Sequence, residues 1–167
     1  MGIIYTICFL FRVNNGIKEI CLGEKLKGFR KGTLNGSGGK LKAGETYKDC
    51  AIRETTEEFG IKVLDIEKYG EVYFYDPGLT HECHVYVVKQ WHGEPHKVYN
   101  SDTGEPEMDP HWYSIDAIPY ERMGTTDKYW LKPLLAGGKF KASFRYDAND
   151  QMYDPKLEEL LPEYNFE

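Results

Sequence analysis

Three glutamates, Glu54, Glu57 and Glu58, lie within five positions of one another in a segment, 46–59, that is predicted to be helical. In a helix, positions i, i+3 and i+4 share one face, so the three carboxylates would point the same way. Each like-charge i,i+4 pair costs about 0.2–0.5 kcal/mol in an isolated helix. Arg53 can offset part of this by pairing with Glu57, whereas Glu54 and Glu58 have no such neighbour on the helix. A divalent cation would resolve the repulsion, and oxygen ligands favour Mg²⁺ or Mn²⁺ over zinc.

A solvated acidic face is the alternative interpretation of this run, because such charge runs are common on helices. The flanking residues favour the metal site. Gly38 and Gly39 precede the helix, and without side chains they let the backbone approach a metal ion or a phosphate closely. Gly60 follows as a helix stop. Another arc of the helix carries residues suited to packing against a sheet, namely Ala51, Ile52, Thr55 and Phe59.

The rest of the chain predicts strands before and after this helix. Asn14, Asn15 and Gly16 form a hairpin signal between the first two β-rich runs. The glycine-rich segment 28–39 and the polar segment 96–110 are expected to be loops. Strands are predicted over 3–12, 17–23, 62–75, 82–91, 111–115 and 139–146, helices also over 117–123 and about 126–136, and a mixed tail after 146. This pattern predicts a mixed sheet sandwiched between helices.

Composition and charge are typical of a globular protein. With 167 residues, 41% of them hydrophobic and 29% charged, the chain is predicted to be one domain, 1–167. A net charge of −6 argues against a sequence-independent grip on DNA or RNA, but not against a nucleotide held through a metal ion. Four scattered cysteines fit core positions in a reducing compartment, so a cytoplasmic location is expected. The apolar start, 3–11, is interpreted as a strand rather than a signal peptide, and no membrane partner is expected.

The acidic run belongs to a longer pattern with fixed spacing. Every fixed position of G-x5-E-x7-R-E-U-x-E-E-x-G-U is matched, by Gly39, Glu45, Arg53, Glu54, Glu57, Glu58, Gly60 and Ile61. The one departure is Thr55, where a bulky aliphatic residue is usual. The chain therefore resembles the Nudix hydrolases. The resemblance implies an α/β (α+β) fold, the Nudix-type α/β/α sandwich with a central mixed β-sheet, and Mg²⁺-dependent attack of water on a diphosphate linkage.

The resemblance also implies a set of metal ligands. By matched position, Glu54, Glu57 and Glu58 would bind the ion, with Glu57 and Glu58 the more central. The Gly38 carbonyl is expected to be a further ligand, and so is Glu107. Mg²⁺ is the expected cofactor, with Mn²⁺ as the alternative.

Further residues would complete the catalytic set. The resemblance implies that Arg53 orients a glutamate and that Glu45 anchors the loop or the metal network. Glu107, in PEMDPHW, matches a glutamate that approaches the metal site from a distant loop. Which carboxylate acts as the base varies across the family, and here Glu58 or Glu107 is expected to take this role.

The resemblance extends beyond this motif to the MutT-type oxidised-purine nucleoside triphosphatases, and it covers nearly the whole chain. The segments that carry it are YTICFLF, GFRKGTLNGSGGK, HVYVV, PEMDPHWYSIDAIPYERM, DKYW and KFKASFRY. It implies that Asn35 hydrogen-bonds the purine, since a neutral amide can both donate and accept. Without the resemblance, Asn35 would be interpreted as a turn residue. The other predicted substrate-binding residues are Thr6, Phe29, Gly39, Lys40, Phe74 and Asp127.

Two positions depart from that subfamily. Its members have a tryptophan that stacks on the base and two consecutive aspartates that read the base edge. Here Gly124 and Thr126 replace the tryptophan and the first aspartate, and only Asp127 remains. Base stacking is worth about 1–3 kcal/mol, so losing the ring would weaken binding unless another aromatic residue substitutes. Asp127 alone would fit equally well as an ordinary acid at a helix N-terminus.

These features lead to one hypothesis and three alternatives. The first is a hydrolase of the nucleotide-pool sanitation type, releasing pyrophosphate from a purine nucleoside triphosphate, oxidised or not. A Nudix hydrolase acting on a dinucleoside polyphosphate, a nucleotide sugar or an ordinary dNTP comes second. An inactive nucleotide-binding module comes third, because such proteins lose the motif glutamates, and an acidic helix with no ligand comes last. The expected partner is a small nucleotide rather than a nucleic acid polymer, and both a monomer and a homodimer remain open.

Overall fold

The structure is a computed structural model that describes residues 2–166, so Met1 and Glu167 of the predicted domain 1–167 lie outside the described residues. One nine-stranded mixed sheet has the order β3-β2-β1-β6-β5-β8-β9, with β4 paired to β1 and β7 paired to β2. The strands are β1 (Gly2–Asn14), β2 (Ile17–Lys25), β3 (Leu34–Asn35), β4 (Ser37–Lys40), β5 (Lys62–Asp76), β6 (Leu79–His92), β7 (Met108–Ser114), β8 (Lys139–Tyr146) and β9 (Met152–Leu160). The helices are α1 (Tyr47–Phe59) and α2 (Asp127–Leu135), with a 3-10 turn, η1 (Tyr120–Arg122).

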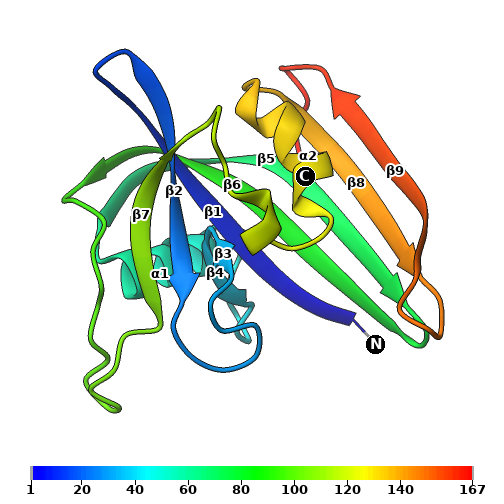
Figure 1. The fold of residues 1–167 in the computed structure, drawn as a ribbon, viewed down its shortest axis with the longest axis horizontal. Coiled ribbons are helices and arrows are strands. Elements are labelled where there is room, and N and C mark those ends of the chain that lie inside the picture. The colour runs from blue at the N-terminus through cyan, green and yellow to red at the C-terminus, as the bar shows by residue number, and fades with distance from the viewer. Residues whose placement is uncertain (1, 167) are drawn as a thin grey trace.

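Alternating side chains of β1 build the two halves of the core. Ile7 and Phe9 pack in a cluster that includes Trp130 of α2, whereas Cys8 lies in a cluster that includes Phe59 of α1. Successive residues of a strand point to opposite faces of a sheet, so the two helices must cover opposite faces. Figure 1 shows α1 behind β2 and β7, and α2 in front of β8. The predicted α/β/α sandwich with a mixed sheet is confirmed.

Helix α1 begins and ends where the sequence predicts. The Thr46 side chain accepts a hydrogen bond from the Asp49 amide at 3.1 Å, which satisfies one of the free N–H groups of the first turn. Gly60 ends the helix with φ of 68°, a left-handed conformation that glycine adopts without steric cost. The two caps set the length of α1, whose buried residues are Cys50, Ala51, Thr55 and Phe59.

Strand pairing brings the two glycines before α1 to the middle of the sheet. β4 pairs antiparallel with β1, with Gly39 opposite Thr6 and Gly38 opposite Ile7. A Cβ atom on Gly38 would overlap the Thr6 carbonyl oxygen, so only glycine fits this approach. The pairs β1–β6 and β5–β8 are parallel, and the other pairs are antiparallel.

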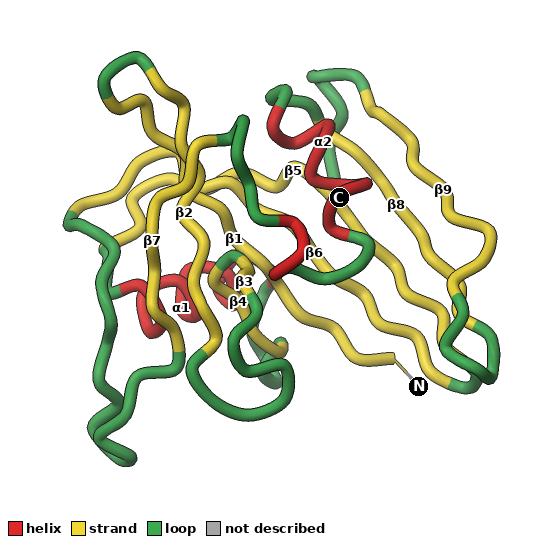
Figure 2. Tube along the Cα trace, viewed as in Figure 1, coloured by secondary structure: helices red, strands yellow, loops and turns green. Residues whose placement is uncertain are grey.

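Three elements differ from the sequence-based prediction. The segment 28–39 is not wholly a loop, because its end forms β3 and β4. The predicted helix over 117–123 is only the turn η1, which follows Pro119. The tail contains β9, an exposed strand at the edge of the sheet (Figure 2), and its exposed side chains leave no inside–outside alternation to signal a strand. Within residues 2–166, neither helix has the length and apolar character to span a bilayer.

Candidate functional site

Arg53 is the centre of a carboxylate network on α1. Its Nε and Nη2 donate to the two oxygens of Glu45, at 2.5 and 3.0 Å, and Nη1 donates to Glu54 Oε1 at 2.6 Å. The predicted i,i+4 pair is present, with Nη1 3.3 Å from Glu57 Oε2. Arg53 also donates to the Lys40 carbonyl oxygen at 3.3 Å. Glu54 therefore has a cationic neighbour on the helix, which the spacing argument did not foresee.

This network sets the charge of its members. Hydrogen bonds donated by the Arg53 side chain and by the Lys42 amide lower the pKa of Glu45 to about 2. The hydrogen bonds that Arg53 donates to Glu45 and Glu54 raise the pKa of Arg53, so the guanidinium stays charged. A bidentate guanidinium–carboxylate pair is geometrically specific. Arg53 thus links Glu45 to Glu54, and the orienting role of Arg53 and the anchoring role of Glu45 stay predictions.

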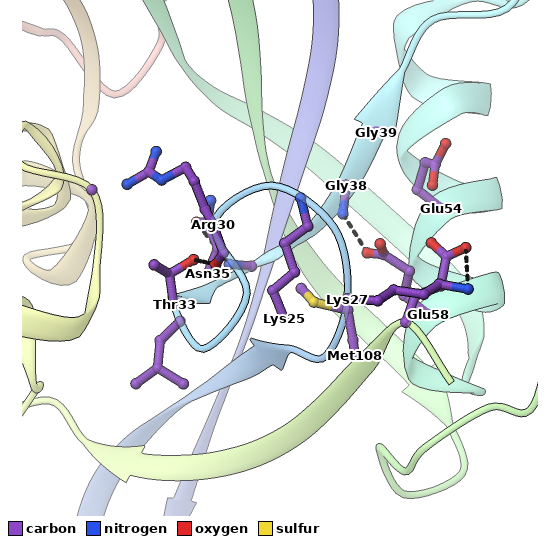
Figure 3. A pocket seen from close by; sticks show the side chains of 14 residues that line it. Lys25, Lys27, Arg30, Thr33, Asn35, Gly38, Gly39, Glu54, Glu58 and Met108 are labelled. Atoms are coloured by element: carbon purple, nitrogen blue, oxygen red, sulfur yellow. Dashed lines mark hydrogen bonds and ion pairs between the residues drawn. The ribbon is translucent and has the colours of Figure 1, made fainter. Parts of the chain in front are cut away.

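Glu58 points into the first of three adjoining cavities. The Gly38 amide donates to Glu58 Oε2 at 2.8 Å, as Figure 3 shows. Burial raises the pKa of Glu58 to about 8, and the charges of Glu54, Glu107 and Glu57 add to the rise. The first cavity has a volume of about 440 Å³, and Glu54, Glu58 and Glu107 line it. Glu57 does not line it, and 55% of its side chain is exposed.

Glu107 reaches this cavity from far along the chain because β7 pairs with β2. The pairing sets Met108 opposite Lys25, and the Leu26 amide donates to the Glu107 carbonyl oxygen at 2.9 Å. The Glu107 carboxylate lies 3.7 Å from Lys27 Nζ. Glu107 thus lies at the cavity wall although it is distant along the chain from Glu54 and Glu58.

The donor set fits Mg²⁺ or Mn²⁺, because the three acidic side chains that line the cavity offer oxygen ligands and their mutual repulsion calls for a cation. Within residues 2–166, no three His, Cys, Asp or Glu side chains already form a metal-binding group. Glu54 and Glu57 are both engaged by Arg53, and Glu58 by Gly38. Each of these hydrogen bonds uses one oxygen of its carboxylate, and the second oxygen of each can bind an ion.

The cavity also holds three cations that were not predicted from the sequence, Lys25, Lys27 and Arg30. Positive side chains facing carboxylates suit a ligand that carries both phosphates and a metal ion. The run KLKGFRK, 25–31, carries the signal, with four cations in seven residues, but a net charge of −6 conceals it.

A second cavity, of about 460 Å³, adjoins the first on the side of α2. Asn35, Phe29, Phe74 and Asp127 all line it, so four of the predicted substrate-binding residues meet there. Phe29 is 85% exposed and contributes from the tip of a loop. The Asn35 side-chain oxygen accepts from the Gly36 amide at 2.9 Å, which leaves its NH₂ group to donate to a ligand.

Asp127 lies at the start of α2 and is 7% exposed. The Gly124 amide donates to its Oδ2 at 3.0 Å. Burial raises the pKa of Asp127 to about 6, and the Gly124 hydrogen bond and the Arg30 charge oppose this rise. Gly124 and Thr126, the two positions that depart from the MutT-type pattern, line the same cavity, as does Trp130.

A third cavity, of about 480 Å³, opens beside β1 and β4. The remaining predicted substrate-binding residues, Thr6, Gly39 and Lys40, line it together with Phe29 and Asn35. Thr6 is 1% exposed, and its hydroxyl lies 3.4 Å from the Cys50 sulfur atom on α1. All seven predicted substrate-binding residues thus line at least one of the three cavities.

Comparison with known proteins points to one family. The NUDIX domain model matches residues 5–134. The chain is 35% identical over 144 residues to a zebrafish (Danio rerio) protein named oxidized purine nucleoside triphosphate hydrolase, covering 85% of this chain and 88% of that protein. It is 34% identical over 145 residues to the mouse (Mus musculus) protein of that name, covering 86% and 88%. The crystal structure of the MutT protein from Bacillus halodurans superposes with a TM-score of 0.72 at 23% identity, covering 93% of this chain and 97% of that one.

Proposed function

The chain belongs to the NUDIX family and is a Nudix hydrolase, and on this premise we propose that it hydrolyses a purine nucleoside triphosphate to the monophosphate and pyrophosphate. The observation that carries the proposal is the first cavity, where Glu54, Glu58 and Glu107 face three cations. The adjoining second cavity offers aromatic and polar groups for a base. A phosphate chain in the first cavity and a base in the second would account for both linings.

Each part of the site has a role in this proposal. Nudix hydrolases generally require a divalent metal ion, and we propose Mg²⁺, held by Glu54, Glu57, Glu58, Glu107 and the Gly38 carbonyl oxygen. When bound, the ion supplies positive charge to the phosphates and makes the attacking water more acidic. Lys25 and Lys27 bind phosphate oxygens as point charges.

The chain's own groups position the reaction. Gly38 and Gly39 let phosphates approach the backbone, since neither position has a side chain. Arg53 fixes Glu54 through the bidentate contact with Glu45. Glu58 takes the proton of the attacking water, and Glu107 is the alternative base. Both line the cavity, as a general base must to reach its proton.

The test is a substrate panel with purified protein and Mg²⁺. Pyrophosphate and a monophosphate from purine (d)NTPs, with a slower reaction on pyrimidine (d)NTPs, support the proposal. The Glu58→Gln variant is the control, and its turnover should fall by orders of magnitude while its circular dichroism spectrum is unchanged. Intact nucleotides at saturating Mg²⁺ and Mn²⁺ would refute the proposal.

A second candidate function is hydrolysis of a diphosphate linkage in a different class of substrate. The third cavity adjoins the other two through Arg30 and Asn35, so the site has room for a second group beyond the phosphates. A dinucleoside polyphosphate or a nucleotide sugar would place such a group there. In the same panel, two nucleotides released from a dinucleoside polyphosphate, or a nucleoside monophosphate and a sugar phosphate released from a nucleotide sugar, would identify this activity.

The proposal includes a cytoplasmic location. The four cysteines are buried free thiols, the form favoured in a reducing compartment. Sedimentation of the purified chain would distinguish a monomer from a homodimer.

A further inference from the structure

Arg30 has an unusual backbone conformation that its surroundings hold in place. Its φ is 64°, in the left-handed region that residues other than glycine rarely adopt. The Thr33 amide and hydroxyl both donate to the Arg30 carbonyl oxygen, at 3.1 and 2.7 Å. The Lys31 amide donates to the Gly28 carbonyl oxygen at 3.2 Å. These hydrogen bonds fix the turn, and with it the direction in which the Arg30 side chain leaves the backbone.

The Arg30 side chain stands where the three cavities meet. Among their described lining residues, only Arg30 and Asn35 line all three. In Figure 3 the guanidinium extends away from Glu54 and Glu58. No carboxylate within residues 2–166 forms an ion pair with it. The guanidinium therefore retains donors for a ligand.

The charge of Arg30 acts mainly on the second cavity. Burial raises the pKa values of Asp127, Tyr5 and Tyr146, and the Arg30 charge opposes the rise in each. All three residues line the second cavity. No such effect of Arg30 is found on Glu58, whose neighbouring charges are the other glutamates. The Arg30 guanidinium therefore acts on the proposed base site more than on Glu58 of the first cavity.

The second cavity combines a donor and an acceptor of opposite charge. Arg30 presents N–H groups in a planar fork, which can donate two parallel hydrogen bonds. Asp127 presents a carboxylate whose Oδ2 is held by the Gly124 amide. A base that fits this cavity must accept on one edge and donate on the neighbouring edge.

Guanine has this arrangement. Its O6 and N7 atoms are adjacent acceptors that an arginine can bind with both arms, and its N1–H and N2–H₂ groups donate on the next edge. Adenine carries an amino group in place of O6, so it offers only one acceptor there. Oxidation at C8 places a hydrogen on N7 and removes that acceptor.

Resting on the proposed nucleotide hydrolysis, we propose that Arg30 is a specificity-determining residue that binds O6 and N7 of guanine and selects guanine nucleotides with an unoxidised ring. Asp127 receives the donors of the neighbouring guanine edge. The zebrafish and mouse relatives are named for oxidised purines, so this selection would distinguish the present protein from them.

The test measures the binding of nucleoside monophosphates by calorimetry, without metal, so that no turnover is required. The wild type should bind dGMP about tenfold or more tightly than dAMP, 7-deaza-dGMP and 8-oxo-dGMP. The reason is that dAMP lacks the O6 acceptor, whereas the other two lack the N7 acceptor. Arg30→Gln should reduce these ratios to near one. Arg30→Lys keeps the charge but not the fork, and it should also lose most of the preference.

Lys31→Gln is the matched control, because Lys31 is an exposed cation of the same loop that lines none of the three cavities. It should preserve every ratio. Equal binding of dGMP and 7-deaza-dGMP by the wild type, or an unchanged ratio in Arg30→Gln, overturns the inference. If the ratios depend on Arg30 but no triphosphate is hydrolysed, the proposed function fails and the inference stands.

Discussion

Gly39 lies against the Glu54 carboxylate so closely that a Cβ atom added to Gly39 would overlap it. β4 brings the glycine to this place, and Arg53 holds the carboxylate in position opposite it. Gly39 is therefore needed for the position of Glu54, a predicted metal ligand, in addition to the phosphate approach proposed for it. This contact joins the first fixed residue of the motif to the middle of α1.

Gly39→Ala should displace Glu54 and impair catalysis without unfolding the protein. A displacement of about 1 Å in a catalytic constellation can cost about 100-fold in rate, and a loss of this order in kcat/KM is expected. The Mg²⁺ concentration for half-maximal activity should rise as well. Combining Gly39→Ala with Glu54→Gln should cost little more than Glu54→Gln alone, because both changes act on one carboxylate. Full additivity of the two losses in the double variant would contradict this view.

Arg53→Lys should lower kcat/KM about 10- to 100-fold, the range typical of residues that orient metal ligands. A lysine keeps the charge but cannot donate to Glu45 and Glu54 at once in a fixed plane. The half-saturating Mg²⁺ concentration should rise, which a loss of stability alone would not produce. Arg12→Lys is the control, since Arg12 also holds two glutamates, at 2.6 and 3.1 Å, but lies outside the cavities. Equal effects of the two substitutions on Mg²⁺ activation would count against the orienting role.

Asp127 should make the stability of the protein depend on pH. Burial raises the pKa of Asp127 from its ordinary 3.8 to about 6, so the native state holds this proton more tightly than the unfolded chain does. The native state therefore loses relative stability as the pH rises from about 4 to about 6. Relative to Asp127→Asn, the wild type should lose on the order of 1–3 kcal/mol of unfolding free energy over this interval. Denaturant unfolding of both proteins at pH 4 and pH 7 measures the difference.

The same comparison tests the Arg30 charge. Arg30 opposes the rise of the Asp127 pKa, so Arg30→Gln should move the midpoint of the pH effect upward. Lys31→Gln, which removes a charge from the same loop, should leave the midpoint in place. A wild type and an Asp127→Asn variant with parallel stability curves between pH 4 and pH 7 would show that the buried carboxyl is not perturbed.

The fold and the acidic helix were predictable because the relevant signals are local. Thr46 and Gly60 mark the ends of α1, and the fixed spacing of the motif places its glutamates on one helix. The wrong prediction at 117–123 and the missed strand β9 have local causes too. Pro119 precedes a turn of only three residues, and β9 is exposed along nearly its whole length.

The parts of the candidate site that depend on pairing between distant strands were harder to predict from the sequence. Spacing alone gives Glu57 and Glu58 the same face, but it does not show that only Glu58 lines the cavity. Lys25 joins the site because β2 pairs with β7. The position of Arg30 depends on a left-handed φ, which composition and periodicity do not reveal for an arginine.

Thr55, the one departure from the motif, has a structural partner that spacing could not identify. Its hydroxyl donates to the Ala51 carbonyl oxygen at 2.8 Å and lies 2.8 Å from the Ser37 hydroxyl, and Ser37 and Thr55 are both fully buried. Since Thr55 gives its hydrogen to Ala51, Ser37 donates to Thr55. The aliphatic residue usual at this position would leave the Ser37 hydroxyl without its acceptor.

Thr55→Val should therefore lower the unfolding free energy by about 1–3 kcal/mol, the cost of a buried polar group left unpaired. Ser37→Ala should cost less, about 1 kcal/mol, because Thr55 keeps its bond to Ala51. The double variant should lie close to Ser37→Ala alone, since replacing both partners by apolar groups removes the unpaired hydroxyl. Denaturant unfolding of the four proteins gives the coupling free energy of the pair. Simple addition of the two single costs would mean that the hydroxyls do not depend on each other, and the substitution in the motif would then need another explanation.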